Sequence, residues 1–513
     1  MAIAVQLSAV SKLFGTFAAN SNISLAVEGG TIHALVGENG AGKSTLTKMI
    51  YGMYQPTTGE ISIKEKTIRF TSPREAITAG IGMVHQHFML IPELSVAENI
   101  ILGHEGCSLF RRLPLKSAKE RIRHDAEAYG LAVDPDALVS SLSIGEQQRV
   151  EILKLLFRQA EIMMFDEPTA VLTPSETDRL FATLQALRNK GKTIILITHK
   201  LDEVLAVADT VSVMRQGKII DTLPAKSVTK PELAQMMVGR NVLLNVNNPA
   251  ATPGEIILTI NNLSYRSAKG EEKLRGMSLQ VRAGEIYGIA GVEGNGQSEL
   301  LQVLWGMLPD GTHLSGHVTH KGNSMIGKQP AAIAAMGISH TPEDRLRHAV
   351  ITDYTVEENL IFGRHRESIF HQGIGFKQSA LNDYAKTMIA SYDIRCEAPA
   401  TQLLGSLSGG NQQKVVLARE MNRPNTTLLI LAQPTRGVDI GAIETIHKKI
   451  IGARQQGMAI LLISSELEEI IGLATRIGCI YKGSIRHEFS QREVESKRTN
   501  EHEFQQEIGL HIT

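Results

Sequence analysis

The sequence predicts an α/β protein built from two tandem domains, each with a mostly parallel sheet flanked by helices. Short apolar runs such as residues 162–165 and 194–197 have the length and composition of buried parallel strands. A glycine-rich turn at residues 37–45 lies between an apolar run and a helical pattern. The motifs of the first half then recur in the same order in the second half. Because 513 residues are too many for one hydrophobic core, this duplication predicts two domains.

The glycine-rich turn matches the GxxxxGK[ST] pattern of a phosphate-binding loop. Its glycines let the backbone N–H groups approach a phosphate, and the helix that follows turns its positive end to the same anion. Lys43 would add a positive charge near the β- and γ-phosphates, and Ser44 or Thr45 would offer a hydroxyl to Mg²⁺. The loop residues expected to contact the nucleotide are Gly37, Glu38, Asn39, Gly40, Ala41, Gly42, Lys43, Ser44 and Thr45.

Composition argues against a nucleic-acid-binding, membrane-spanning or secreted protein. The 53 basic residues balance the 53 acidic ones, so no overall field favours nucleic acid or an anionic membrane. The N-terminus lacks the charged and apolar regions of a signal peptide, and no apolar stretch approaches about 18 residues. An odd number of widely spaced cysteines fits a reducing compartment, so we expect a cytosolic chain. These cysteines are Cys107, Cys396 and Cys479.

The duplication sets the expected domain boundaries. Gly291 opens a second glycine-rich turn after a copy of the strand that precedes Gly37. We expect domains at residues 1–240 and 255–488, because each copy spans somewhat more than 200 residues, a normal domain size. A polar segment with two prolines and a glycine at residues 241–254 predicts a linker. The charge-rich tail at residues 489–513 is expected to be loosely structured.

Four further residues accompany the first loop. Asp166 ends an apolar strand, the usual place for a carboxylate that holds Mg²⁺, and Glu167 beside it can polarise an attacking water. Gln86 can reach the metal or the water, and His199 ends another strand where it can contact the γ-phosphate. A carboxylate pair after a strand is also common as a plain strand end. The shared order of all these elements in two copies favours the catalytic interpretation.

The second copy differs at every one of these chemical positions. An amide cannot act as a general base, and without the carboxylate a metal ligand is lost, so the second loop lacks the groups for hydrolysis. The replacements are Gln297 for Lys43, Ala432 for Asp166, Gln433 for Glu167, Ser465 for His199 and Glu343 for Gln86.

The whole pattern resembles the ATP-binding-cassette (ABC) ATPases over nearly the full chain, with LSIGEQ at 142–147 and LSGGNQ at 407–412 as signature segments. Two cassettes in one chain and QPTRGVD at 433–439 look like the monosaccharide and nucleoside importers. Residues 83–90, 170–174 and 291–298 are similar to the nucleoside branch. The resemblance implies a RecA-like core, an antiparallel β subdomain and an inserted helical subdomain in each copy. The helix expected at residues 114–129 would belong to that helical subdomain.

The resemblance also implies ATP and Mg²⁺ as ligands, with Ser44, Gln86 and Asp166 around the metal. Family cassettes pair head to tail, so each ATP is held between one phosphate loop and the opposite signature. The one complete site would then combine the first loop with the second signature, through Ser408, Gly409, Gly410 and Gln412. Phe14 sits where the family stacks an aromatic ring on adenine, with Tyr265 as its counterpart in the second copy.

By the same resemblance, the chain energises import of nucleosides, or of simple sugars such as ribose or galactose. Its partners would be two integral-membrane permeases and an extracytoplasmic solute-binding protein, and it would lie at the cytoplasmic face of the membrane. A soluble twin-cassette ATPase acting on ribosomes or nucleic acid is the alternative. That class carries a long charged linker, unlike residues 241–254, and the basic residues near 111–123 alternate with acids as on a solvated helix face. A regulator that only binds ATP fits poorly with Asp166, Glu167 and His199.

Overall fold

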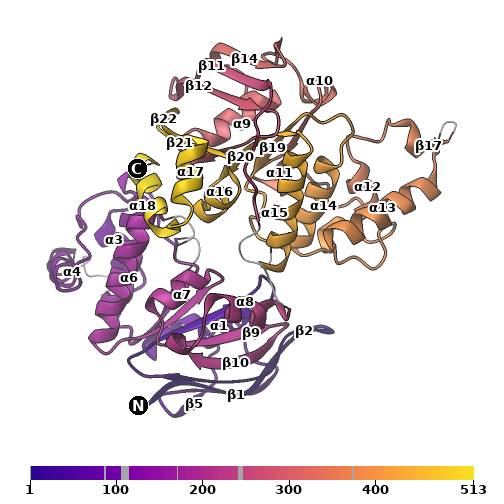
Figure 1. The fold of residues 1–513 in the computed structure, drawn as a ribbon. Helices are drawn as coiled ribbons and strands as arrows, with labels where there is room; N and C mark the ends of the chain where they lie inside the picture. Colours follow the sequence, from indigo (N-terminus) through magenta and orange to yellow (C-terminus); the bar gives the residue numbers. More distant parts are fainter. Residues whose placement is uncertain are drawn as a thin grey trace. The chain divides into compact units, whose positions relative to one another are not determined.

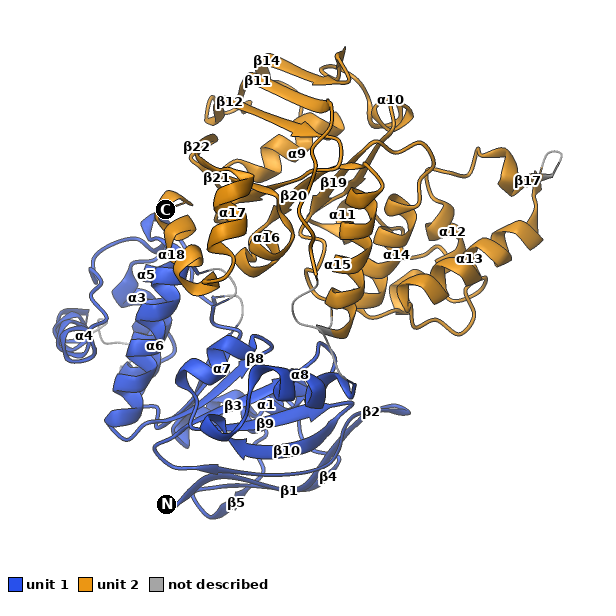
Figure 2. Cartoon of the chain, viewed as in Figure 1, with its two compact units in different colours: residues 1–242 blue, residues 243–513 orange. Residues whose placement is uncertain are grey.

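The computed structural model describes residues 2–85, 88–104, 115–169, 172–240, 247–372, 375–438 and 440–512. The chain divides into two compact units, Met1–Val242 and Leu243–Thr513, which we call the first and the second unit (Figure 2). Of the segment expected to be a linker, residues 241–246 lie outside the described part, and residues 247–254 form neither helix nor strand.

The first unit is centred on a sheet whose strands run in the order β10-β9-β3-β8-β7-β6 (Figure 1). All neighbouring pairs are parallel except β9 and β10. The residues of β3, β6 and β8 are buried throughout, as expected for strands covered on both faces. The strands are β3 (Ile32–Gly37), β6 (Ile81–Val84), β7 (Ile162–Asp166), β8 (Thr193–Thr198), β9 (Thr210–Arg215) and β10 (Lys218–Pro224).

A second, antiparallel sheet of this unit has the order β2-β1-β4-β5. Its strands are β1 (Ile3–Phe14), β2 (Phe17–Glu28), β4 (Thr58–Ile63) and β5 (Lys66–Ile68). Alternating buried and exposed residues along β2 show that one face of this sheet covers the core and the other meets solvent. The helices are α1 (Lys43–Ile50), α2 (Pro73–Thr78), α3 (Val96–Ile101), α4 (Leu115–Tyr129), α5 (Ile144–Phe157), α6 (Pro174–Asn189), α7 (Leu201–Val207) and α8 (Lys230–Val238).

The second unit repeats this plan. Its main sheet runs β16-β19-β20-β13-β21-β22 and its antiparallel sheet β12-β11-β14-β15. The strands are β11 (Ile256–Arg266), β12 (Glu272–Arg282), β13 (Ile286–Ala290), β14 (His313–His320), β15 (Asn323–Ser324), β16 (Ile338–Thr341), β19 (Leu428–Ala432), β20 (Ala459–Ser464), β21 (Arg476–Tyr481) and β22 (Ser484–Phe489). The predicted fold class, two tandem α/β domains with an antiparallel β subdomain and an inserted helical segment, is therefore confirmed.

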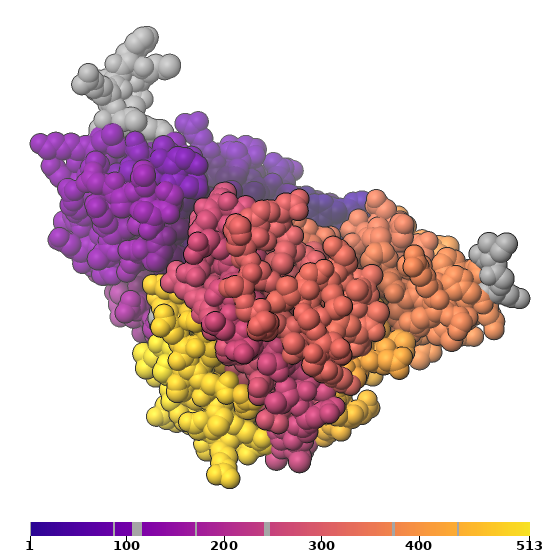
Figure 3. Space-filling view, turned by 90° about the horizontal axis from the view of Figure 1, so that it is seen from above, coloured from indigo at the N-terminus to yellow at the C-terminus, as the bar shows by residue number. Residues whose placement is uncertain are grey.

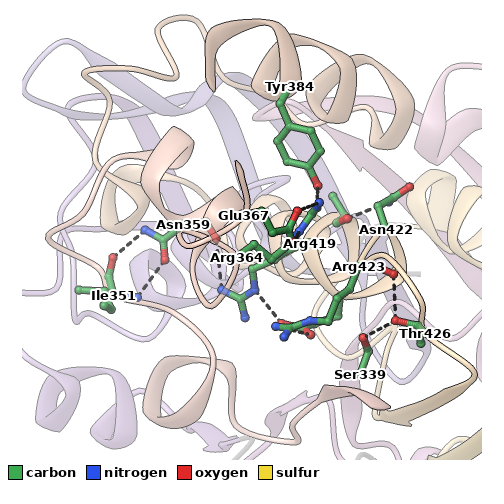
Figure 4. A network of polar contacts seen from close by, with 12 residues as sticks. Ser339, Ile351, Asn359, Arg364, Glu367, Tyr384, Arg419, Asn422, Arg423 and Thr426 are labelled. Atoms are coloured by element: carbon green, nitrogen blue, oxygen red, sulfur yellow. Dashed lines mark hydrogen bonds and ion pairs between the residues drawn. The ribbon is translucent and has the colours of Figure 1, made fainter. Parts of the chain in front are cut away.

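Along the chain, the helical part of the first unit lies between β6 and β7, and that of the second unit lies between β16 and β19. In the second unit it includes β17 (His371–Gln372), β18 (Gly375–Phe376), α12 (Val356–Ile361), α13 (Gln378–Tyr392) and α14 (Gly409–Met421). A buried polar network joins these helices (Figure 4). Arg364 donates to both carboxylate oxygens of Glu367 at 2.8 Å, and Arg419 of α14 donates to the carbonyl of Asn359 in α12 at 3.2 Å. Because Asn359, Arg364 and Arg419 are buried and hydrogen-bonded, the network fixes α14 against α12.

The expectation of a loosely structured tail is wrong. Residues after β22 form α17 (Gln491–Lys497) and α18 (Glu501–Ile512), and Figure 3 shows the C-terminal part of the second unit in yellow. Phe504, Ile508 and Ile512 are at most 3% exposed and belong to the core of the second unit. Their spacing of four residues places them on one face of a helix. The high charge of the tail concealed this amphipathic pattern.

We expect Phe504→Ala to lower the free energy of unfolding of the second unit by about 3–5 kcal/mol, as for other buried aromatic truncations. The Phe504 ring lies edge-on to Phe489 with centroids 5.1 Å apart, so a cavity would open between α18 and β22. Chemical denaturation of the full chain would measure the loss. Leu510→Ala on the same helix is the control, because Leu510 is 79% exposed and its truncation should cost less than about 0.5 kcal/mol.

No helix in the described ranges is both long enough and apolar enough to cross a membrane.

Candidate nucleotide site

The phosphate loop of the first unit connects the buried strand β3 to helix α1. Gly40 and Gly42 have φ values of 82° and 98°, a conformation that side-chain-bearing residues rarely adopt. A Cβ at Gly42 would also lie 2.5 Å from the carbonyl of Ala19 and from the amide of Asn20. These glycines let successive backbone N–H groups face one concave space at the N-terminus of α1, which is the arrangement that binds phosphate.

Lys43 is the first residue of α1 and is only 6% exposed. Its Nζ donates to the carbonyl oxygens of Gly37 at 2.7 Å and Glu38 at 3.1 Å, so the ammonium group is held over the loop. Burial lowers the pKa of Lys43, and the negative charges of Glu167 and Asp166 oppose that shift. A buried cation in a loop of inward-facing N–H groups is suited to a phosphate chain. Ser44, the next residue, is exposed at the same end of the helix.

Of the two predicted carboxylates, Asp166 is the last residue of β7, the neighbour of β8 in the sheet, and Glu167 follows it. The strand register places Asp166 opposite Ile197 and Val36 opposite Thr198, so the ends of β3, β7 and β8 meet at one edge. Burial raises the pKa of Asp166, the adjacent charge of Glu167 raises it further, and Lys43 and Lys48 oppose both effects. The carboxyl edge of a parallel sheet is the usual place for a ligand site in such folds.

Glu167 and His199 form a direct pair at this edge. The Nδ1 of His199 lies 2.9 Å from Oε1 of Glu167, and the backbone N–H of Glu167 donates to Ile197 O at 2.8 Å. Burial acts to raise the pKa of Glu167, but the hydrogen bond and charge of His199, together with Lys43 and Lys200, outweigh it and lower the pKa. Glu167 is therefore an ionised carboxylate near neutral pH, the form that can accept a proton.

A buried network behind this pair was not predicted from the sequence. Glu203 of α7 accepts hydrogen bonds from the hydroxyls of Thr169 and Thr198, and burial raises the pKa of Glu203. Thr198 also accepts from the backbone N–H of Lys200 at 3.0 Å. These bonds fix the two turns that carry Glu167 and His199. The sequence signal was a glutamate four residues after His199, on the buried face of a helix.

The other predicted contacts of the first loop are placed as follows. Phe14 ends β1, is 44% exposed and lies edge-on to Tyr54 at 5.4 Å between ring centroids. Asn20 of β2, missed by the sequence analysis, donates from Nδ2 to Gly42 O at 3.2 Å and so ties the antiparallel sheet to the loop. Gln86 lies outside the described residues, so its role stays a prediction.

Each signature segment begins a helix. Ser143 caps α5 in a reciprocal capping box with Glu146, and Ser408 caps α14, where it accepts from the side chain of Asn411 at 2.9 Å. Gly409 and Gly410 form the first turn of α14. Gln412 is buried and donates to the carbonyl oxygens of Leu404 and Leu407, so it holds the preceding turn rather than facing solvent.

The second phosphate loop keeps the backbone shape without the chemistry. Gly294 and Gly296 have φ values of 91° and 110°, close to those of the first loop. Gln297 takes the place of the lysine, donates to Val292 O at 3.0 Å and leaves its buried Oε1 without a partner in the described structure. A cavity of about 230 Å³ lies against this loop and is lined in part by Glu343, which accepts from Ser298 at 2.7 Å.

The strand ends of the second unit also lack the carboxylates and the histidine of the first unit. Gln433 has a φ of 50°, nearly that of Glu167 at 48°, although neither is glycine. Its Oε1 accepts from the hydroxyl of Ser465 at 3.2 Å, where the first unit has the glutamate–histidine pair. The backbone strain of a catalytic turn is retained here without a carboxylate. The preceding position is Ala432, which is fully buried.

The expected adenine-stacking role of Tyr265 is wrong. Tyr265 is 3% exposed and belongs to the core of the second unit. Asn262 of β11 and Ala9 of β1 occupy the same positive-φ bulge, with φ values of 49° and 52°. Counting from that bulge, Tyr265 stands at the inward-facing position of Lys12, not at that of Phe14.

The first unit thus presents the fold and side chains of a phosphate-loop nucleotide hydrolase. Residues 20–170 and 274–436 match the model of the family described as ABC transporter. The chain belongs to the ABC transporter family, and it is an ATP-binding ATPase of that family.

Three relatives have similar length and organisation. The chain is 45% identical over 482 residues to the nucleoside import ATP-binding protein NupA of Lactococcus lactis, with 94% of each chain covered. It is 43% identical to the guanosine import ATP-binding protein NupO of Bacillus subtilis, again with 94% of each covered. It is 42% identical to the glucose import ATP-binding protein TsgD13 of Haloferax volcanii, covering 99% of this chain and 95% of the relative.

We expect Lys43→Ala to weaken ATP binding by about 1.5–3 kcal/mol, or roughly 10- to 100-fold in Kd, because it removes a buried cation beside the phosphates. Equilibrium binding of ATP to the full chain measures this. Gln297→Lys is the matched change at the second loop. It should leave the number of ATP molecules hydrolysed per chain unchanged, because Ala432, Gln433 and Ser465 still lack the hydrolytic groups. A doubled turnover in Gln297→Lys would contradict this assignment.

Proposed function

We propose that this chain is the ATP-hydrolysing subunit that energises import of nucleosides through separate membrane permeases. The observation that carries the proposal is the complete set of Lys43, Asp166, Glu167 and His199 in the first unit. This set occurs in a chain that matches nucleoside-import relatives over almost its full length. A protein that only binds ATP would have no need for the Glu167–His199 pair. Ribose, galactose and glucose are the competing solutes, because sugar-import proteins are also among its relatives.

We propose further that one composite ATP site serves each chain. In this arrangement the phosphates lie on the loop of Lys43, and the second signature completes the site through Ser408, Gly409 and Gly410. Two features support this choice over the reverse pairing. The second loop lacks a lysine and both carboxylates, and the second signature has a glycine where the first has Ile144. Gln412 would act by holding the turn before Ser408.

The residues of the first unit fit Mg²⁺ at the hydroxyl of Ser44 and the carboxylate of Asp166, with Gln86 as the remaining predicted ligand. When bound, the metal would neutralise charge on the phosphates. Asp166 is partly buried at the sheet edge beside Lys43, so its charge is available there and is not dispersed by solvent.

Glu167 would act as the general base of hydrolysis. The oxygen of water forms a bond to the γ-phosphorus, the bond from that phosphorus to the bridging oxygen breaks, and the proton of the water passes to Glu167. His199 donates to Oε1 of Glu167 and so holds the carboxylate in place at the sheet edge. The lowered pKa of Glu167 keeps it ionised before the step.

The proposed partners are two integral-membrane permeases and an extracytoplasmic solute-binding protein, with this chain at the cytoplasmic face of the membrane. The test is ATP hydrolysis by the chain assembled with these partners in lipid vesicles, with nucleosides, ribose, galactose or glucose supplied to the binding protein. Nucleosides should stimulate hydrolysis at the lowest concentrations. Stimulation by a sugar alone would move the substrate class to sugars. Stimulation by ribosomes or RNA, with none by solutes, would replace import by the alternative function.

A further inference from the structure

An arginine with no ion-pair partner among the described residues lies beside the signature helix of the second unit. Arg345 begins the short helix α11 (Arg345–His348), four residues after strand β16 ends. Its Nη1 donates to the carbonyl of Arg436 at 3.4 Å, and its buried Nε has no hydrogen-bond partner in the described structure. No carboxylate of the described residues lies within ion-pair distance of this guanidinium. Arg345 is therefore a partly buried cation with unused donors.

The guanidinium of Arg345 lies against the first residue of α14. A Cβ at Gly409 would overlap Nη2 of Arg345, so glycine at this position is what lets the arginine lie there. Gly437, with a φ of 75°, borders the same group on its other side at 3.6 Å from a Cβ to Nη1. Two glycines thus make room for one charged side chain at the N-terminus of the signature helix.

This placement is unfavourable unless an anion is nearby. The N-terminus of a helix carries partial positive charge, so a cation beside it is repelled. Burial and the neighbouring charge of Arg436 lower the pKa of Arg345, and the charge of Asp344 opposes this shift only in part. Removal of an uncompensated charge from water is expensive, and the usual compensation is a carboxylate or a phosphate. The adjacent Asp344 is the opposing charge, but no described carboxylate forms an ion pair with this guanidinium.

The first unit differs at both positions of this contact. Phe88 lies four residues after β6, where the second unit has Arg345, and Ile144 follows the cap of α5, where the second unit has Gly409. The arginine and the glycine that accommodates it therefore occur together, and only in the second unit. By the proposed function, this is the unit whose signature completes the hydrolytic site.

We propose that Arg345 is a further catalytic residue, which contacts the γ-phosphate of the ATP held by Lys43. This inference rests on the proposed composite site and adds to it a residue outside the motifs described above. Arg345 makes and breaks no bond in the reaction. Its guanidinium would offer paired N–H donors to the γ-phosphoryl oxygens, a geometry that arginine provides and lysine does not.

The test compares kcat and KM for ATP in the complex of the full chain with its permeases, using ATP and Mg²⁺. Arg345→Ala and Arg345→Gln should each lower kcat by about 10- to 100-fold, the range for a charge-assisted hydrogen bond. KM should change less, because most phosphate contacts remain on the loop of Lys43. Arg345→Lys should recover part of the loss. Arg347→Ala is the control for charge on the same helix, because Arg347 is exposed, and it should retain full activity.

A double-mutant cycle separates a catalytic role from a structural one. Gly409→Ala should displace Arg345 and lower kcat in the parent chain, but add little in the Arg345→Ala background. Gly410→Asp reports on the composite site itself. If Gly410→Asp is inactive while both Arg345 variants stay within about twofold of the parent, the inference about Arg345 is wrong and the composite site stands. If Gly410→Asp hydrolyses ATP normally, the proposed site has failed. Additive effects of Gly409→Ala and Arg345→Ala would also overturn the inference.

Discussion

We expect Glu167→Gln to lower the rate of ATP hydrolysis by about 10²–10⁴-fold while ATP still binds, the loss typical for removal of a general base. The amide is nearly isosteric with the carboxylate and can still accept the hydrogen bond from His199. It cannot take a proton from water. The loop of Lys43 is unchanged by the substitution, so the phosphates keep their contacts. The loss should therefore fall on kcat.

Gln433→Ala is the matched change in the second unit. Gln433 has the same backbone conformation as Glu167, but it is already an amide and accepts hydrogen bonds from Ser465. Its truncation should change turnover by less than about threefold, because no general base is removed. Steady-state ATPase rates and ATP binding would be measured for both variants in the assembled complex. Equal losses from the two changes would contradict a single hydrolytic site.

The sequence was sufficient to predict the fold class. The period of the apolar runs, the glycine-rich turn and the duplication predicted two α/β domains, and the structure confirms them. The position of Asp166 at a sheet edge was equally predictable, because it ends an apolar run with the length and composition of a buried parallel strand. The sequence alone could not show which strand ends lie next to each other in the sheet. The 2.9 Å contact of Glu167 with His199 joins residues 32 positions apart and depends on the register of β7 and β8.

Other features depend on packing that the sequence pattern concealed. Tyr265 was misassigned because the two copies were aligned two residues out of step: counted from the bulge shared by Ala9 and Asn262, Tyr265 corresponds to Lys12 and not to Phe14. The tail was misjudged because its charges outnumber the few apolar residues that bind α18 to the core. Arg345 and Gly409 are 64 positions apart, and their contact becomes visible only when the turn after β16 lies against α14. In each case a long-range contact decided the outcome.

Substitutions in the two signature segments test whether the second unit completes the ATP site of the first unit. Gly410→Asp changes no residue of the first unit, yet it should lower hydrolysis at the loop of Lys43 by about 10²–10³-fold. That is the scale of losing a preorganised donor to developing charge, and the new carboxylate would also repel the phosphate. Any account in which the first unit works alone expects full activity. ATP binding to the loop should persist, since Lys43 remains.

Gly145→Asp is the matched substitution in the first signature, which would face the second loop. A Cβ at Gly145 lies 2.5 Å from Oε1 of Glu176, so this variant has a local cost, and its thermal unfolding must be followed beside its activity. The decisive measurement is the ratio of steady-state ATPase rates of Gly145→Asp and Gly410→Asp in the assembled complex. We predict that Gly145→Asp hydrolyses ATP at near the parent rate and that Gly410→Asp is almost inactive. A folded Gly145→Asp that is inactive beside an active Gly410→Asp would show that the two sites are assigned the wrong way round.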